Sequence, residues 1–592
     1  MTPAARRFLF IGAAAAIAIP AIAQVQNNVA PAPAPAPTQN TSAPSEPASE
    51  SESPPARSQS PMESDTVEVS AEDLVLEPPP PPIEYPSYAR RNPFTAGALD
   101  PALSGLGDDI WGDSSGVFLS GLMRRTQTPL ASRWAHIALR QALLASARSP
   151  RGVNPVDWAA ERSWLLLRMG EADASRMIIS AVDTDRFTPK MVQVAVQSAL
   201  ANSDPLGLCA FHSQIPDEER RIAPLVDSMC SALNGEASSA AAQIDSARRR
   251  GSVGGIDLVL AQKVVGAASD SGRAVTVEWE PVQALTAWRY GLSTATGMAP
   301  PERLVESASP QLRAWFARAP LIPFRDRLES ARIATGLGVF SSQALTDFYS
   351  WIYDSTDAND LSGSDAWQLR LAFAATDHAD RLTAMRRLWG EGEDDPLLRE
   401  ASRALLGRAA ARINPNPELQ SDSPELIASM LAAGMDRHAA RWANAVGQMD
   451  DEFSDPAWAM LALVAPESAE VDVSVGRINA FIGRDESSGK KRSALLVAGL
   501  AALGKLDIGA ASRLNSRYGL NIQRSSPWTQ MVDAAARRRQ PGSVLILAGI
   551  GLQARDWDAV PSSHLFHIVM ALRNTGQDFS ARMVAAEALA RT

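Results

Sequence analysis

Apolar residues recur at helical spacing along most of this chain, and short breaks that contain glycine separate the helical segments. Near the C-terminus four apolar residues lie at positions i, i+3, i+4 and i+7 and form one stripe on a helix: Leu565, Ile568, Val569 and Leu572. A second stripe follows after a short break: Phe579, Met583 and Ala586. In that break, Gly576 is expected to end one helix in the left-handed conformation, and Asp578 to cap the next helix. Two helices joined so tightly must pack antiparallel.

The same kind of break occurs several times. A glycine is followed within three residues by an acidic residue, and then by small residues and a larger apolar one, at Gly170, Gly434, Gly504 and, more loosely, Gly235. Successive breaks lie 32, 38, 37 and 35 residues apart, at Gly434, Pro466, Gly504, Pro541 and Gly576. Each interval is about the length of one helical hairpin. Alternating strand patterns are almost absent, and the best candidate, Ala274–Trp279, is short.

These features predict an all-α body over residues 93–592. The spacing and composition of residues 150–592 resemble tetratricopeptide-type helical-hairpin repeats, although the fixed Trp, Tyr, Phe and Pro positions of that family are absent. The resemblance implies an α-solenoid in which each hairpin packs on its neighbours. One irregular all-α bundle is the alternative. The chain as a whole also resembles a group of uncharacterised secreted α-proteobacterial proteins with a Pro-rich lead and an Ala/Arg-rich helical body.

Residues 1–23 have the pattern of a secretory signal peptide. Arg6 and Arg7 precede the apolar run Phe8–Ile19, and Ala21–Ala23 supplies the small-x-small sequence that a signal peptidase accepts. The run is shorter than the ~20 residues that span a bilayer, and no later apolar run reaches that length. We therefore expect a cleaved signal, a mature protein without an integral membrane segment, and a location in the periplasm or outside the cell. An uncleaved membrane anchor is the alternative.

Residues 24–92 are expected to form a disordered linker. Fifteen of the 41 prolines fall here, and Ala, Ser and Glu fill much of the rest. Such a segment cannot bury enough apolar area to offset the entropy of ordering it, so a semi-stiff, partly polyproline spacer is expected.

The chain has only two cysteines, Cys209 and Cys230. This number excludes a disulfide-dense scaffold and a four-cysteine zinc cluster. The two residues lie on or beside neighbouring predicted helices, and in an oxidising periplasm they are candidates for one disulfide. Two free, buried thiols are the alternative.

No catalytic, cofactor-binding or metal-binding residue is predicted. Gly112–Gly116 matches the Gly-x-Ser-x-Gly pattern of a hydrolase, but no strand precedes it, so Asp113 and Ser114 are interpreted as helix caps. His564 and His567 are spaced to share a metal ion, but no third ligand lies at motif spacing.

Tryptophan is frequent for a chain with so few aromatic residues overall, and we interpret those in helical segments as anchors of the core. They are Trp134, Trp158, Trp164, Trp288, Trp315, Trp389 and Trp442. The alternative is a row of rings on one face that stacks on sugars or on a partner peptide.

The net charge is −10, which argues against a broad grip on nucleic acid or anionic lipid. The sequence therefore favours a periplasmic, non-enzymatic helical-repeat scaffold that binds a protein or a cell-envelope polymer. One alternative is a peptidoglycan-acting enzyme of the lytic-transglycosylase type, by analogy of architecture alone. Another is an assembly factor of an outer-membrane or secretion machine. The sequence indicates neither the partner nor the oligomeric state.

Overall fold

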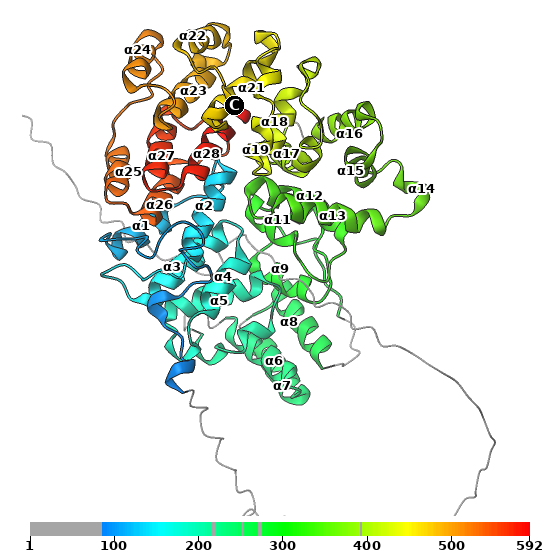
Figure 1. The fold of residues 1–592 in the computed structure, drawn as a ribbon. Coiled ribbons are helices and arrows are strands. Elements are labelled where there is room, and N and C mark those ends of the chain that lie inside the picture. Colours follow the sequence, from blue (N-terminus) through cyan, green and yellow to red (C-terminus); the bar gives the residue numbers. More distant parts are fainter. Residues whose placement is uncertain (1–85, 216–220, 252, 270–274, 391–393) are drawn as a thin grey trace, which may run out of the picture. The chain divides into compact units, whose positions relative to one another are not determined.

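Every regular element in the part of the chain that the structure describes is a helix, as the apolar spacing predicts (Figure 1). The computed structural model describes residues 86–215, 221–251, 253–269, 275–390 and 394–592. The expected signal peptide, most of the expected linker (residues 24–85) and Ala274 lie outside these ranges. Residues 275–279 form no strand, so the strand candidate is wrong for the part described; the Trp279 carbonyl oxygen instead accepts a hydrogen bond from Arg303 at 2.6 Å.

The helices of the first half follow one another through short connections. They are α1 (Gly116–Arg125), α2 (Arg133–Leu144), α3 (Pro155–Arg168), α4 (Ala172–Ser180), α5 (Pro189–Ala201), α6 (Ala223–Leu233), α7 (Ala237–Arg250), α8 (Gly255–Ala268), α9 (Ala287–Ala295), α10 (Glu302–Glu306), α11 (Pro310–Phe316), α12 (Phe324–Leu337), α13 (Ser342–Asp354) and α14 (Ala358–Leu361).

The second half continues in the same way. Its helices are α15 (Asp365–Ala374), α16 (His378–Gly390), α17 (Pro396–Ala410), α18 (Ser423–Ala432), α19 (Asp436–Ala440), α20 (Ala443–Val446), α21 (Asp451–Val464), α22 (Val475–Arg484), α23 (Lys491–Ala502), α24 (Ile508–Tyr518), α25 (Pro527–Arg537), α26 (Pro541–Gly551), α27 (Ser562–Asn574) and α28 (Asp578–Ala590). Short 3-10 turns lie between them, including η5 (Leu206–Leu208) and η6 (His212–Gln214). None of the described helices is both long enough and apolar enough to cross a bilayer.

The five glycine breaks named from the sequence all form the same helix-ending turn. Their φ angles lie between 74° and 88°, at Gly170, Gly235, Gly434, Gly504 and Gly576. At the last of these, the N–H of Gly576 donates to Arg573 and the N–H of Gln577 donates to Leu572, so two carbonyl groups at the end of α27 gain partners. The turns join α3 to α4, α6 to α7, α18 to α19, α23 to α24 and α27 to α28.

The predicted cap at Asp578 is wrong. Asp578 is the first residue of α28, and the capping position belongs to Gln577, which makes no side-chain cap. Asp507, after the Gly504 break, does cap its helix by accepting from the N–H of Ala510 at 2.9 Å. The connection before α24 has five residues (503–507) and the connection before α28 has three (575–577), which places Asp507 just before its helix and Asp578 just inside. In the first turn of α28, the Asp578 carboxylate still stabilises the helix, because it lies near the positive end of the helix dipole.

Helices pack both on their neighbours in sequence and across long separations. Pairs such as α3–α4, α17–α18 and α27–α28 pack side by side. In addition, α2 packs against α26 and α28, which lie beside it in Figure 1, and touches α12. A series of packed pairs therefore runs from α2 through α12, α17, α18, α21 and α28 and returns to α2.

Basic side chains close the C-terminal ends of neighbouring helices. The last carbonyl groups of a helix lack partners within it and carry the negative end of its dipole. Long cations from other parts of the chain bond to these groups in α1, α2, α11, α18, α21 and α28 through Arg168, Arg162, Arg327, Arg133, Lys505 and Arg403, respectively. Arginine, which supplies 51 of the 56 basic residues, suits this role because its planar group bonds to several oxygens at once.

The seven tryptophans assigned to the core lie there. Trp158, Trp288, Trp315 and Trp442 are buried. Trp134, Trp164 and Trp389 are partly buried and pack against the same core. They join helices rather than line an open face, so the interpretation as anchors is confirmed.

Candidate functional site

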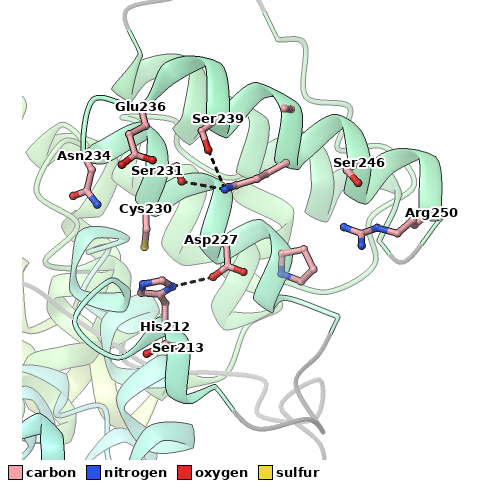
Figure 2. Close-up of a pocket in the computed structure, with 13 residues that line it drawn as sticks. His212, Ser213, Asp227, Cys230, Ser231, Asn234, Glu236, Ser239, Ser246 and Arg250 are labelled. Carbon is pink, nitrogen blue, oxygen red and sulfur yellow. Dashed lines mark hydrogen bonds and ion pairs between the residues drawn. The ribbon is translucent and has the colours of Figure 1, made fainter. Parts of the chain in front are cut away.

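An open polar hollow lies beside the two cysteines, between η6, α6 and α7 (Figure 2). Its volume is about 930 Å³. Hydroxyl, amide and ionisable side chains dominate its lining, among them His212, Asp227, Ser231, Ser239 and Gln243. Such a lining can offer hydrogen bonds to a polar molecule from the solvent.

Two cross-links hold the segments on either side of this hollow together. Cys209 and Cys230 form a disulfide with their Cα atoms 5.5 Å apart. Beside it, Nδ1 of His212 and Oδ1 of Asp227 lie 2.9 Å apart. Asp227 and Cys230 are three residues apart on α6, and therefore share a face of that helix. Cys209 and His212 have the same spacing on the opposite segment.

The sequence interpretation considered the cysteines but missed His212 and Asp227. The available signal was the matched spacing, Cys-x-x-His in one segment and Asp-x-x-Cys in the other. One segment carries a cysteine and a base, and the other carries a cysteine and a carboxylate at the same spacing. The two segments can therefore pair twice, once through the sulfurs and once through His212 and Asp227. The side chains of His212 and Asp227 are 41% and 47% exposed, so their ion pair contributes little to stability.

A second polar cluster is buried along one face of α2. Arg133, His136 and Arg140 follow one another at i, i+3 and i+7. Nε2 of His136 lies 3.0 Å from Oε1 of Glu171, and Arg140 donates to the same oxygen at 2.8 Å. At the N-terminus of α2, the Glu587 carboxylate accepts hydrogen bonds from the N–H groups of Arg133 at 2.7 Å and Trp134 at 3.2 Å.

Burial shifts the ionisation of these groups in opposite directions. Loss of solvent lowers the pKa of His136 and so disfavours the charged form of its ring. For Glu171 burial acts to raise the pKa, but the charge of Arg140 and the hydrogen bond from His136 outweigh it and bring the pKa below the ordinary value. Burial raises the pKa of Asp173 to about 6 against the opposing charge of Arg318. Burial and the neighbouring Glu587 raise the pKa of Glu400.

The buried cluster is closed to solvent. Arg133, His136, Glu171 and Glu587 are each at most 5% exposed. Shifted pKa values are a mark of active sites, but they also arise in structural ion networks. Here Glu171, at the start of α4, and Glu587, on α28, both bond to residues of α2. We therefore interpret the cluster as the polar centre of the fold.

The hydrolase-like motif is part of a helix start. Ser114 donates to Oε1 of Gln540 at 3.0 Å, and Asp113 accepts from the Gln540 side chain, so neither residue caps α1 as predicted. Ser115 is the cap, accepting from the N–H of Phe118 at 3.4 Å. The serine that carries the motif is thus bonded to a distant glutamine, and its roles are structural.

The two histidines of α27 face different partners. Nδ1 of His564 lies 3.0 Å from the carbonyl oxygen of Gly551, and Nδ1 of His567 lies 2.8 Å from Oδ1 of Asp533. Among the described residues, no group of three His, Cys, Asp or Glu side chains is arranged to hold a metal ion.

Comparison with protein families, with curated proteins and with solved structures gave no significant match.

Proposed function

We propose that this protein is a non-enzymatic helical scaffold of the periplasm that binds a protein or a polymer of the cell envelope. In this proposal the α-hairpins act as a solenoid-type array, with α2 joining its first and last parts. The signal-like N-terminus supports the location, and the run of tightly joined helix pairs supports the array. The cluster of ionisable groups along α2 lies inside the fold, which favours binding over catalysis.

The observation that carries the proposal is a rigid aromatic surface on α13. The side chain of Trp351 is 60% exposed. Its ring stacks on Phe324, with centroids 5.5 Å apart and planes within 3°. Phe324 is itself fixed by an edge contact with Phe348 at 4.9 Å and by the guanidinium of Arg327 at 4.6 Å. An exposed ring held in place from below is typical of binding surfaces, because little entropy is lost when a ligand stacks on it.

The test measures binding and release together. The purified full-length protein is sedimented with dye-labelled peptidoglycan sacculi, and crosslinking with mass spectrometry in the native host identifies protein partners. We expect Trp351→Ala to weaken capture of the ligand about tenfold or more. Leu321→Ala, which removes an equally exposed apolar side chain (60%), is the matched control and should leave capture unchanged.

Each outcome has a definite meaning. Release of dye from the sacculi would show the alternative, a peptidoglycan-acting enzyme. A crosslink to an outer-membrane or secretion component would show that the ligand is a protein and would identify the scaffold as an assembly factor. Equal capture of the ligand by Trp351→Ala and Leu321→Ala would show that the aromatic surface on α13 is not the binding surface.

A further inference from the structure

We propose that the Cys209–Cys230 disulfide is a site of thiol–disulfide exchange, in which His212 assists departure of the Cys230 thiolate. The structure places a base beside the disulfide, which the sequence did not reveal. This inference is independent of the proposed binding function.

Asp227 holds the imidazole of His212 against α6, the helix that carries Cys230. Asp227 and Cys230 lie one turn apart on the same face of α6. Asp227 holds Nδ1 of His212 at 2.9 Å, so the ring is tethered about one helical turn from Cys230. Both residues line the hollow, and in Figure 2 the Cys230 sulfur is turned toward the side where His212 lies.

The two sulfurs differ in their surroundings. Cys230 is only 3% exposed, whereas Cys209 is partly exposed. Because Cys209 is the more exposed residue of the pair, we place the attack of the thiolate on Cys209 and assign Cys230 as the leaving group. Exchange is faster when the departing thiolate is stabilised. His212, at 41% side-chain exposure, can exchange protons with solvent and deliver one to that thiolate.

The step balances with a dithiol as reductant. One thiolate of the dithiol attacks Sγ of Cys209 and forms a mixed disulfide, while the Cys209–Cys230 bond breaks and its electron pair leaves on Sγ of Cys230. Protonated His212 gives that sulfur a proton. The second thiol then attacks the mixed disulfide and releases Cys209, which takes its proton from water. The dithiol is oxidised to a disulfide, and the protein is reduced to two thiols.

Three ionisable side chains besides His212 line the hollow. They are Asp227, Glu236 and Arg250. Asp227 orients the ring through its 2.9 Å contact with Nδ1 of His212.

The test follows reduction of the native, full-length protein by dithiothreitol at about neutral pH, with thiol labelling and intact-mass measurement. We expect His212→Gln to slow reduction about tenfold and Asp227→Asn to slow it by a smaller factor. Ser246→Ala, at the rim of the same hollow, is the control and should match the wild type. In denaturant, where the hollow is lost, all variants should be reduced at one rate.

A second measurement uses the wild-type protein and therefore does not depend on how well a variant folds. Wild-type protein is treated with glutathione, and the mixed disulfide is trapped and located by peptide mapping. We expect the adduct on Cys209. An adduct on Cys230, a native His212→Gln rate within twofold of wild type, or a disulfide that is reduced only on unfolding would overturn the proposal and leave the bond a purely structural cross-link.

Discussion

Arg539 adopts a backbone conformation that residues with side chains rarely occupy. Its φ angle is 54°, and its N–H donates to Ala536 while the next N–H, of Gln540, donates to Ala535. This is the turn that glycine makes at Gly576, built here with an arginine whose side chain is exposed. A left-handed residue with a Cβ costs about 1 kcal/mol or more relative to glycine.

We predict that Arg539→Gly is neutral or stabilises the protein by about 0.5 kcal/mol, because relief of the left-handed strain outweighs the added freedom of the unfolded chain. The preceding residue, Arg538, is also exposed but has φ −84°. Arg538→Gly should therefore destabilise by about 1 kcal/mol. Urea unfolding of the two variants checks this opposite response, and equal effects would contradict it.

Asp173 makes the stability of the protein depend on pH. Its folded-state pKa of about 6 lies above the ordinary value of 3.8, so between these pH values the folded state binds the proton more tightly. The stability that this proton supplies is present at low pH and is lost as the pH rises through about 6.

Relative to Asp173→Asn, which does not titrate, the wild type should gain about 2 kcal/mol of unfolding free energy between about pH 7.5 and about pH 4.5. Denaturant unfolding at the two pH values measures this difference. The exposed Asp380→Asn serves as control and should show no such change. A difference between wild type and Asp173→Asn that does not vary with pH would refute the assignment.

At the scale of helices, capping by arginine links the ends of several helices to other segments of the chain. Arg162 is 1% exposed and donates to the carbonyl oxygens of Leu143 and Ala145, both at 2.9 Å, and to that of Ala96. One side chain thus closes the end of α2 and fixes the segment that precedes α1. Burial lowers the pKa of Arg162 to about 10, so the group stays charged at neutral pH.

Arg162→Met should destabilise the protein by about 2–4 kcal/mol, because it leaves buried carbonyl groups without partners while nearly preserving volume. Arg437→Met, at an exposed site, should change stability by less than about 0.5 kcal/mol. The free energies of unfolding in urea provide the comparison. A small effect at Arg162 would mean that water replaces the guanidinium.

Helix positions were largely predictable, and their caps were not. The apolar stripes and the glycine breaks correctly placed turns such as those at Gly434 and Gly576, because both signals are local. The side chains that satisfy helix ends come from elsewhere, so neighbouring residues do not reveal them. Ser114 shows the difference: it looked like a cap in sequence, and it bonds to Gln540, 426 residues away.

At the scale of the whole body, Glu587 joins the first long helix to the last. Its carboxylate accepts hydrogen bonds from the N–H groups of Arg133 and Trp134. The Ser132 hydroxyl accepts from the third N–H group, that of Ala135. All three amides of the first turn of α2 are thereby satisfied, two of them by a residue of α28 about 450 positions away. A negative charge here also complements the helix dipole.

Glu587→Ala should destabilise the protein by about 3 kcal/mol and raise amide hydrogen exchange in α2 as much as in α28. Glu306→Ala, at an exposed site on α10, should change neither. Hydrogen exchange read peptide by peptide tests this. Loss of protection in α28 alone would show that the two helices open independently.

The sequence could not predict this junction or the candidate site, for a common reason. Glu587 and Arg133, like His212 and Asp227, are single residues whose significance depends on which helices meet. Periodicity defines the faces of helices but leaves their distant partners open. The cysteines were noticed only because there are two of them.

The return of the packed series of helices to α2 constrains how such a protein can evolve. An open array grows or shrinks by duplication or loss of a hairpin, since each new unit needs only one neighbour. Here an added hairpin between α12 and α28 would move Glu587 away from α2 and leave the first amides of that helix bare. Its descendants are therefore expected to vary in surface loops while keeping a fixed number of helices along that path.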